Sequence, residues 1–481
     1  MQFWPEIFIS NRCSTQTMES SQRSVHEETA GGQNVAVNPS PGENHAIAVS
    51  NIQSGGVTDS ENRCFFADRP KTANSLSPEQ AFVNLIKSML GTGLLSLPLA
   101  FKFSGLWLGL VFMFIIFIVC LVCMRQVVFA AHYICYRYGR EVIDYANVMR
   151  GAVEAGPNWI NTKGYIFKQL VNVNIFVAQF GFCSVYFVFM ADNLENFFTC
   201  NTAIHLSKAM WMSILLIPIL LLCSIRRLNM LASFAFVANI IYICSVIIVL
   251  HFFFTHLQPS SRLPAVGKIT NFPLYFGTVM FAFEGVAVIL PIENRMNQPQ
   301  FFIQWNGVLN SANLVVLAVY AMVGFYGYLA VGDDVADTVT LNLPQEPFYQ
   351  LIKLSFVVCV MVSYPLQFFV PMERIEKWIM RKIVVEKQIL YIYCARYGLV
   401  LLTCAIAQVV PHLALVISFI GAFSGASLAL LFPPCIELLV SYAQKNLTAG
   451  LWVKNITLLC FAVLGFSTGT YSALVNIAEK F

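Results

Sequence analysis

Charged side chains are scarce in this chain. Asp, Glu, Lys and Arg together make up 11% of its 481 residues, whereas hydrophobic residues make up 57%. Soluble domains carry about 25% charged residues, so the composition excludes a soluble globular protein. We therefore expect a multi-pass integral membrane protein that contacts membrane lipid and binds no nucleic acid.

Histidine is also scarce, with seven residues in the whole chain. Those near apolar segments fall at predicted span ends or in loops: His132, His251, His256 and His412. No imidazole is then available for acid–base work at the membrane centre, which argues against a membrane-embedded acyltransferase or protease. We expect no enzymatic activity, no cofactor and no metal site.

The fourteen cysteines are scattered and mostly lie inside apolar segments. Cys120 and Cys123 have the spacing of a redox or zinc pair, but they sit in an apolar stretch without a second ligand pair. We interpret them as small hydrophobic side chains within the membrane.

Residues 1–72 lack any persistent apolar period and are rich in Ser, Gln, Asn, Gly and Glu. This composition predicts a disordered tail. Its start has no cationic region and no proper apolar core, so we do not expect a signal peptide. Residues 73–481 form the predicted membrane domain.

Apolar runs divide this domain. A bilayer span needs about 20 apolar residues, and eleven segments qualify approximately. They are 80–103, 106–131, 168–197, 208–225, 229–254, 271–292, 307–331, 348–371, 391–410, 413–436 and 450–473.

Basic residues gather in alternate loops, after the second, fourth, sixth, eighth and tenth segments. Because cytosolic loops carry the excess of Lys and Arg, the tail is predicted to be cytosolic and the C-terminus to be extracellular or lumenal. The glycosylation sequons at Asn446 and Asn455 then lie on or near the cytosolic face and should be unused.

Two of the segments are interrupted near their centres. The first carries Gly91-Thr92-Gly93, and the sixth carries Phe283-Glu284-Gly285. A helix that breaks at membrane depth must line a cavity or be buried in protein, and matched breaks in two halves of a chain point to a transporter's binding site. The first five segments and the next five have opposite topology, as in an inverted repeat. The alternative for the glycines is close helix packing through small residues.

Glu284 is the strongest single candidate for a functional residue, because an ionisable side chain at the middle of a membrane span usually marks a functional site. It could bind the amino group of a substrate, carry a coupling proton, or do both; the alternative is that it only caps the broken helix. Phe182, Tyr186 and Ser363 are further candidates for the cavity lining.

Two more charged residues are candidates for coupling or gating. Lys87 precedes the first break by one turn and could place its ammonium in a cation site, or extend to the cytosolic interface. Glu293 and Arg295 lie at the predicted inner mouth, where they could form a gate pair or a solvated surface pair.

Five stretches of sequence carry a family resemblance. They are residues 85–100, 179–193, 281–285 with 290–294, 341–344 and 432–437. In this order they resemble the proton-assisted amino acid transporters of the amino acid/auxin permease superfamily, and the similarity extends from about Thr72 to the C-terminus.

The resemblance implies an all-α integral membrane protein with the LeuT-type 5+5 inverted repeat, an eleventh transmembrane helix, and broken helices 1 and 6. It implies a secondary transporter for small neutral L-amino acids such as glycine, alanine and proline, in the plasma membrane or the lysosomal or vacuolar membrane. The carboxylate would meet the backbone at Gly91, Thr92 and Gly93, and the amine would meet carbonyls near Phe283 or the side chain of Glu284. Gly285, in the same break, is a further candidate for substrate binding. An amino-acid-sensing protein with little flux, whose tail contacts growth-signalling partners, is the alternative.

Three positions depart from the pattern of relatives. Proton-coupled members carry a histidine where Asn84 stands, so proton coupling through that position is not expected and Glu284 is the remaining candidate. Cys200 lacks its expected disulfide partner, because Gln345 and Glu346 occupy that region. Sodium-coupled relatives have an asparagine where Lys87 stands, and a fixed cation there would repel sodium.

Overall fold

The computed structural model describes residues 69, 75–201, 205–225, 228–410 and 412–480. Apart from Arg69, the predicted tail lies outside the described residues. Within the described part every regular element is a helix, and the only extended pairing is one parallel β-bridge between Leu76 and Met296. The expectation of an all-α membrane protein is confirmed.

Nine helical segments of the described chain are long and apolar enough to cross a bilayer, and one bent pair of helices makes a tenth. The pair is α2 (Pro78–Met89) and α3 (Thr92–Ser104), which meet at an angle of 53°. The nine segments are α4 (Leu106–Tyr138), α6 (Gly164–Asn201), α8 (Leu228–Thr255), α9 with α10 (Phe272–Ala282, Val286–Glu293), α11 to α13 (Gln300–Ile303, Val308–Ala321, Gly327–Val331), α14 (Pro347–Lys382), α15 (Val385–Val409), α16 to α17 (Leu413–Ile420, Phe432–Ala443) and α18 (Ala449–Ala478).

The predicted fourth span corresponds to α7 (Lys208–Ser224), an apolar helix of 17 residues. It is shorter than the roughly 20 residues of a typical span, so the count of eleven stays a prediction. Several helices also run beyond the predicted apolar segments. α4 continues to Tyr138, where Gly139 ends it in a left-handed conformation with φ 62°, a common way for a helix to stop.

The central helices approach one another closely through small residues. A Cβ added to Gly93 on α3 would lie 2.8 Å from the Cα of Ala282 on α9. A Cβ added to Gly421, in the π-helical turn η7 (Gly421–Gly425), would lie 1.9 Å from the carbonyl oxygen of Gly277 on α9. Such contacts pack membrane helices tightly, because lipid supplies no hydrophobic force between them. α9 is therefore held between α3 and the α16–η7 segment.

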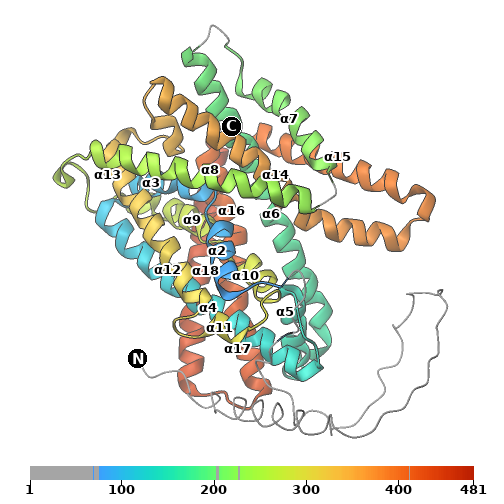
Figure 1. Ribbon diagram of the computed structural model, residues 1–481. Coiled ribbons are helices and arrows are strands. Elements are labelled where there is room, and N and C mark those ends of the chain that lie inside the picture. Colours follow the sequence, from blue (N-terminus) through green and yellow to red (C-terminus); the bar gives the residue numbers. More distant parts are fainter. Residues whose placement is uncertain (1–68, 70–74, 202–204, 226–227, 411, 481) are drawn as a thin grey trace, which may run out of the picture. The chain divides into compact units, whose positions relative to one another are not determined.

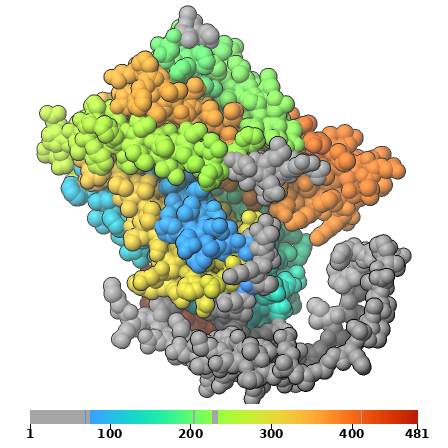
Figure 2. Space-filling view, viewed as in Figure 1, coloured from blue at the N-terminus to red at the C-terminus, as the bar shows by residue number. Residues whose placement is uncertain are grey.

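Burial separates a core from a periphery. In α6 and in the α16–α17 segment, 78% of the most apolar window is buried, against 28% in α15 and 17% in α18. The peripheral helices thus present most of their surface outward, as lipid contact requires. α2 lies beside α10 (Figure 1), and its residues are visible on the face that Figure 2 shows, against the yellow residues that follow the second break.

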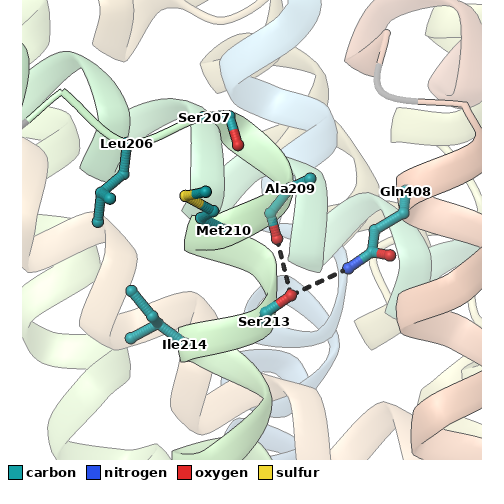
Figure 3. A pocket seen from close by; sticks show the side chains of 7 residues that line it. All are labelled: Leu206, Ser207, Ala209, Met210, Ser213, Ile214 and Gln408. Atoms are coloured by element: carbon teal, nitrogen blue, oxygen red, sulfur yellow. Dashed lines mark hydrogen bonds between the residues drawn. The ribbon is translucent and has the colours of Figure 1, made fainter.

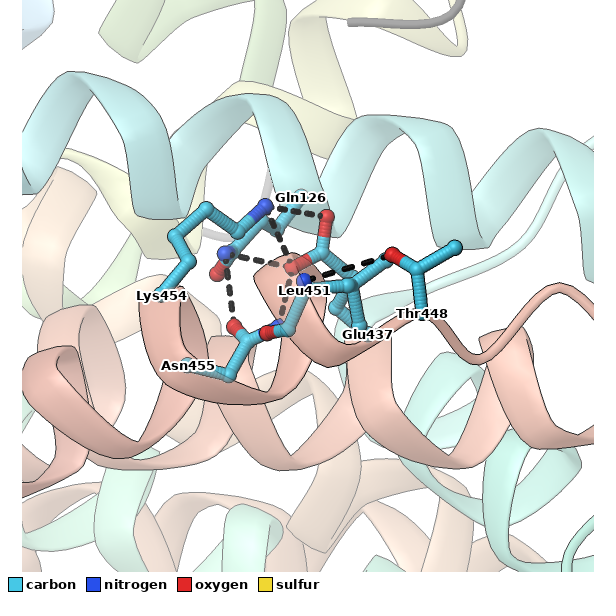
Figure 4. A network of polar contacts seen from close by, with 6 residues as sticks. All are labelled: Gln126, Glu437, Thr448, Leu451, Lys454 and Asn455. Atoms are coloured by element: carbon cyan, nitrogen blue, oxygen red, sulfur yellow. Dashed lines mark hydrogen bonds and ion pairs between the residues drawn. The ribbon is translucent and has the colours of Figure 1, made fainter. Parts of the chain in front are cut away.

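A buried polar cluster anchors the peripheral α18 (Figure 4). The carboxylate of Glu437 on α17 accepts hydrogen bonds from Gln126 Nε2 at 2.8 Å and from Asn455 Nδ2 at 2.7 Å. Lys454 Nζ lies 2.8 Å from the same carboxylate. Because unpaired polar groups are costly in an apolar setting, this cluster fixes α18 against α4 and α17.

Candidate functional site

Both predicted breaks are present, and the first one leaves helix donors free. α2 ends at Met89, and α3 begins at Thr92 after an extended Gly91 with φ −143°. The backbone N–H groups of Thr92 and Gly93 lie in the first turn of α3 and therefore have no intrahelical acceptor. Gly91 has no side chain that could cap them. A helix start of this kind attracts an anion.

The second break separates α9, which ends at Ala282, from α10, which begins at Val286. Between them the N–H of Gly285 donates to the carbonyl of Phe283 at 2.7 Å. This tight turn consumes one donor of the break. It leaves Glu284 at the turn, between the two half-helices.

Two tyrosine hydroxyls form hydrogen bonds with backbone carbonyl groups at the breaks. The Tyr320 hydroxyl lies 2.6 Å from the carbonyl oxygen of Met89 and 2.7 Å from that of Ala282, the last residues of α2 and α9. The Tyr242 hydroxyl donates to the carbonyl of Gly91 at 2.8 Å. Carbonyls at helix ends otherwise lack partners. The Tyr320 hydroxyl has one hydrogen for two of these carbonyls, so one of the two remains available as an acceptor beside the side-chain oxygens of the cavity.

The two breaks line a single small cavity of about 50 Å³. Six of the predicted site residues line it: Gly91, Thr92, Gly93, Phe182, Tyr186 and Glu284. Other lining residues were not predicted, among them Ser88, Gln179, Phe281 and Gln367. The cavity is far below the roughly 300–1,000 Å³ of pockets for drug-sized ligands, so its size suits a very small molecule.

Glu284 is the charged residue of this cavity. Both of its carboxylate oxygens are buried, and neither has a hydrogen-bond partner in the described part of the chain. Gly425 in η7 faces it without a side chain, since a Cβ there would lie 3.5 Å from Glu284 Oε2. Buried polar groups are almost always paired. Two bare acceptor oxygens therefore point to a ligand that brings donors.

Three predicted lining residues lie elsewhere. Phe283 is buried against Tyr320, with ring centroids 5.0 Å apart. Gly285 packs on Met89, because a Cβ there would lie 2.8 Å from the Met89 methyl carbon. Ser363 donates its hydroxyl to the carbonyl of Cys359 at 2.8 Å. Ser363 is not among the residues that line the cavity, whereas Gln367, four residues further along α14, is.

Asn84 and Lys87, the two α2 positions compared with the coupling residues of relatives, are not in the cavity lining. Asn84 is exposed. Lys87 turns toward α8, where its Nζ lies 4.6 Å from the ring centroid of Phe236 in a cation–π contact. The structure thus does not bring the Lys87 ammonium to the cavity.

Glu293 is buried, and its partners differ from the prediction. Instead of pairing with Arg295, its Oε1 lies 3.0 Å from Arg69 and 3.0 Å from Nε2 of His132. Arg69 also donates to the backbone carbonyl of Glu293 at 2.6 Å. Arg295 instead contributes its backbone carbonyl, which accepts from the N–H of Leu76 at 2.7 Å. The segment before α2 is thus tied to the end of α10.

A second, larger hollow lies on the surface between α7 and α15 (Figure 3). It measures about 570 Å³ and is lined mainly by apolar residues, and its wall includes the hydrogen-bonded pair Ser213 and Gln408, 3.3 Å apart. This hollow is shallow and has no charged lining residue. The cavity at the breaks is therefore the candidate site.

Metal and disulfide chemistry find no support in the part of the chain that the structure describes. It contains no group of three or more His, Cys, Asp or Glu side chains placed to hold a metal ion. All twelve cysteines described, Cys200 included, are free thiols.

The geometry defines a polytopic membrane protein whose two helix breaks share one internal cavity. Residues 74–477 match the family described as transmembrane amino acid transporter protein. The chain belongs to this family, which is one of transporters rather than enzymes.

Two curated relatives agree with this assignment. The chain is 31% identical over 407 residues to the proton-coupled amino acid transporter-like protein pathetic of Drosophila melanogaster, covering 84% of this chain and 85% of the relative. It is 25% identical over 448 residues to the probable amino acid transporter skat-1 of Caenorhabditis elegans, covering 89% and 96%. The resemblance stated from the sequence is thereby confirmed at the level of the family.

Proposed function

We propose that this protein is a secondary transporter that moves small neutral L-amino acids, of the glycine, alanine and proline type, across a membrane by alternating access. The main support for this proposal is that residues of both helix breaks line one cavity. This cavity contains the buried carboxylate of Glu284, which has no hydrogen-bond partner among the described residues. The family and the names of both relatives support an amino acid as the substrate.

The cavity offers complementary groups to a zwitterion. The free N–H groups of Thr92 and Gly93, at the positive end of α3, would bind the substrate carboxylate. The oxygens of Glu284 would accept from the substrate ammonium, and such charge-assisted hydrogen bonds are about twice as strong as neutral ones. The volume of about 50 Å³ favours a substrate with little or no side chain.

Alternating access fits a LeuT-type 5+5 inverted repeat followed by an eleventh helix. In this arrangement α3 and α9 are the outer halves of the two broken helices and α2 and α10 are the inner halves. The site lies at the breaks between them, near the midplane, and one bundle rocks against the other. α18, which lies at the periphery and is fastened by the Glu437 cluster, would be the added helix. The N-terminus would be cytosolic, in the plasma membrane or a lysosomal or vacuolar membrane.

We propose Glu284 as the coupling residue if transport is driven by protons, since Asn84 cannot titrate. Protonation of Glu284 would remove a buried charge and so favour the change between the states that open to opposite sides of the membrane. Sodium coupling is not proposed, because Lys87 stands where sodium-coupled relatives carry an asparagine that helps to bind the ion.

Uptake into proteoliposomes tests the function. Purified protein should accumulate labelled glycine, alanine or proline with saturation, and should do so faster with an inward proton gradient than without one. Empty liposomes control for leakage. Saturable binding of an amino acid without any flux, in detergent and in liposomes, would instead support the amino-acid sensor.

A further inference from the structure

Gln179 is an unusual residue at the candidate site. It lies on α6 amid apolar neighbours, its side chain is 5% exposed, and it lines the same cavity as Glu284. Its amide oxygen Oε1 is buried and has no partner among the described residues. An unpaired amide oxygen in an apolar core costs free energy, so a ligand is the natural source of its donor.

The number and type of bare acceptors are informative. Among the side chains of the described residues that line the cavity, three buried acceptor oxygens have no donor, two from Glu284 and one from Gln179. A primary ammonium has three N–H donors and no acceptor. The carboxylate of the same ligand can use the start of α3, on the other helix break. The cavity therefore matches a primary ammonium in charge, donor number and polarity.

We propose that Gln179 is a specificity-determining residue that binds the third N–H of the substrate ammonium, while Glu284 accepts the other two. This inference rests on the proposed function and deepens it. It makes Gln179 responsible for preferring primary over N-methylated amino acids. Sarcosine (N-methylglycine) has two N–H donors, which the two oxygens of Glu284 can take, so it gains little from Gln179.

The test compares glycine and sarcosine in Gln179→Leu, a variant of similar size without hydrogen-bonding groups. Uptake into proteoliposomes gives KM and kcat for both substrates. We expect the glycine KM to rise about tenfold or more, the loss typical of a hydrogen bond to a charged group. The sarcosine KM should rise no more than roughly threefold. The ratio of the sarcosine KM to the glycine KM should therefore fall.

Three further variants make the readout specific. Gln179→Glu keeps an acceptor at this position and should restore the glycine preference. Gln367→Leu removes an amide from another wall of the same cavity and should change both KM values by the same factor. Gln179→Met replaces Gln179→Leu if size-exclusion chromatography in detergent shows that the leucine variant does not fold.

Each outcome decides the matter. An equal rise of both KM values in Gln179→Leu, or no recovery in Gln179→Glu, overturns the ammonium site at Gln179 and leaves transport intact. Wild-type protein with no saturable uptake or binding of either substrate contradicts the proposed function, and the role of Gln179 with it.

Discussion

The hydroxyl of Tyr320 lies 2.6 Å from the carbonyl oxygen of Met89 and 2.7 Å from that of Ala282. A phenol has a single hydrogen, so one tyrosine serves the ends of both half-helices, α2 and α9, and donates to one at a time. The hydroxyl oxygen of Tyr320, on α12, thus contacts both helix breaks of the membrane domain. Movement of either half-helix must change this contact.

We expect Tyr320→Phe to destabilise the protein by about 1–3 kcal/mol, because two buried carbonyls lose their donor. Transport should slow as well, since the breaks lose their common tether. Thermal unfolding in detergent and glycine uptake measure the two effects. Tyr275→Phe is the matched control: its hydroxyl donates to the carbonyl of Gly109 at 2.6 Å, away from the cavity lining. It should lower stability similarly and leave KM unchanged; an identical loss of transport in both variants would contradict the tether.

Glu284→Gln tests proton coupling. The glutamine keeps the size of the side chain and removes its charge, so uptake should lose its dependence on the proton gradient, and the glycine KM should rise about tenfold or more from the lost charge-assisted hydrogen bonds. Uptake at two proton gradients measures this. Glu437→Gln removes a carboxylate outside the cavity and should keep the gradient response. Full gradient dependence in Glu284→Gln would show that the proton site lies elsewhere.

The glycines of the first break should respond differently to a methyl group. At Gly93 a Cβ would lie 2.8 Å from the backbone of Ala282, so Gly93→Ala should destabilise the protein by about 1–3 kcal/mol through overpacking. At Gly91 a Cβ meets no described atom within 4 Å. Gly91→Ala should therefore keep the unfolding temperature and raise the substrate KM, because the added methyl takes up cavity space. The reverse order of the two unfolding temperatures would contradict this geometry.

Breaking the Arg69–Glu293 pair should be costly. The Glu293 side chain is 2% exposed and that of Arg69 is 13% exposed, and removing one partner of a buried pair typically costs about 3–5 kcal/mol. We expect Arg69→Ala to lower the unfolding temperature clearly. Arg150→Ala, which breaks an exposed pair with Glu154, should cost only about 0.3–0.5 kcal/mol. Equal effects of the two substitutions would mean that Arg69 does not fasten α10.

Both helix breaks could be predicted from the sequence because glycine coincides there with a second signal, a Gly-Thr-Gly triplet in the first span and a carboxylate beside glycine in the sixth. The position of Glu284 in the cavity followed for the same reason, since a lone carboxylate in a span has to be accommodated by structure. Span ends were less accurate, as charged residues such as Arg137 continue α4 beyond its apolar run.

The cavity wall contributed by α6 and α14 was predicted only in part. Gln179 and Gln367 are amides on apolar helices, and this polarity was the available signal. Ser363 was chosen instead of Gln367 because sequence fixes the helix face better than the depth along the helix. The pairing of Glu293 with Arg69 and His132 joins residues far apart in the chain, and no local pattern encodes it.

Asn455 has a side chain with no exposed surface, since it holds Glu437 within the cluster that fastens α18. An oligosaccharide cannot be attached to it in the folded protein, on whichever side of the bilayer it lies. Asn446 is exposed in the loop before α18. Of the two sequons, Asn446 alone can thus act as a natural reporter of sidedness: a sugar found there would place this loop in the secretory lumen and invert the assigned orientation.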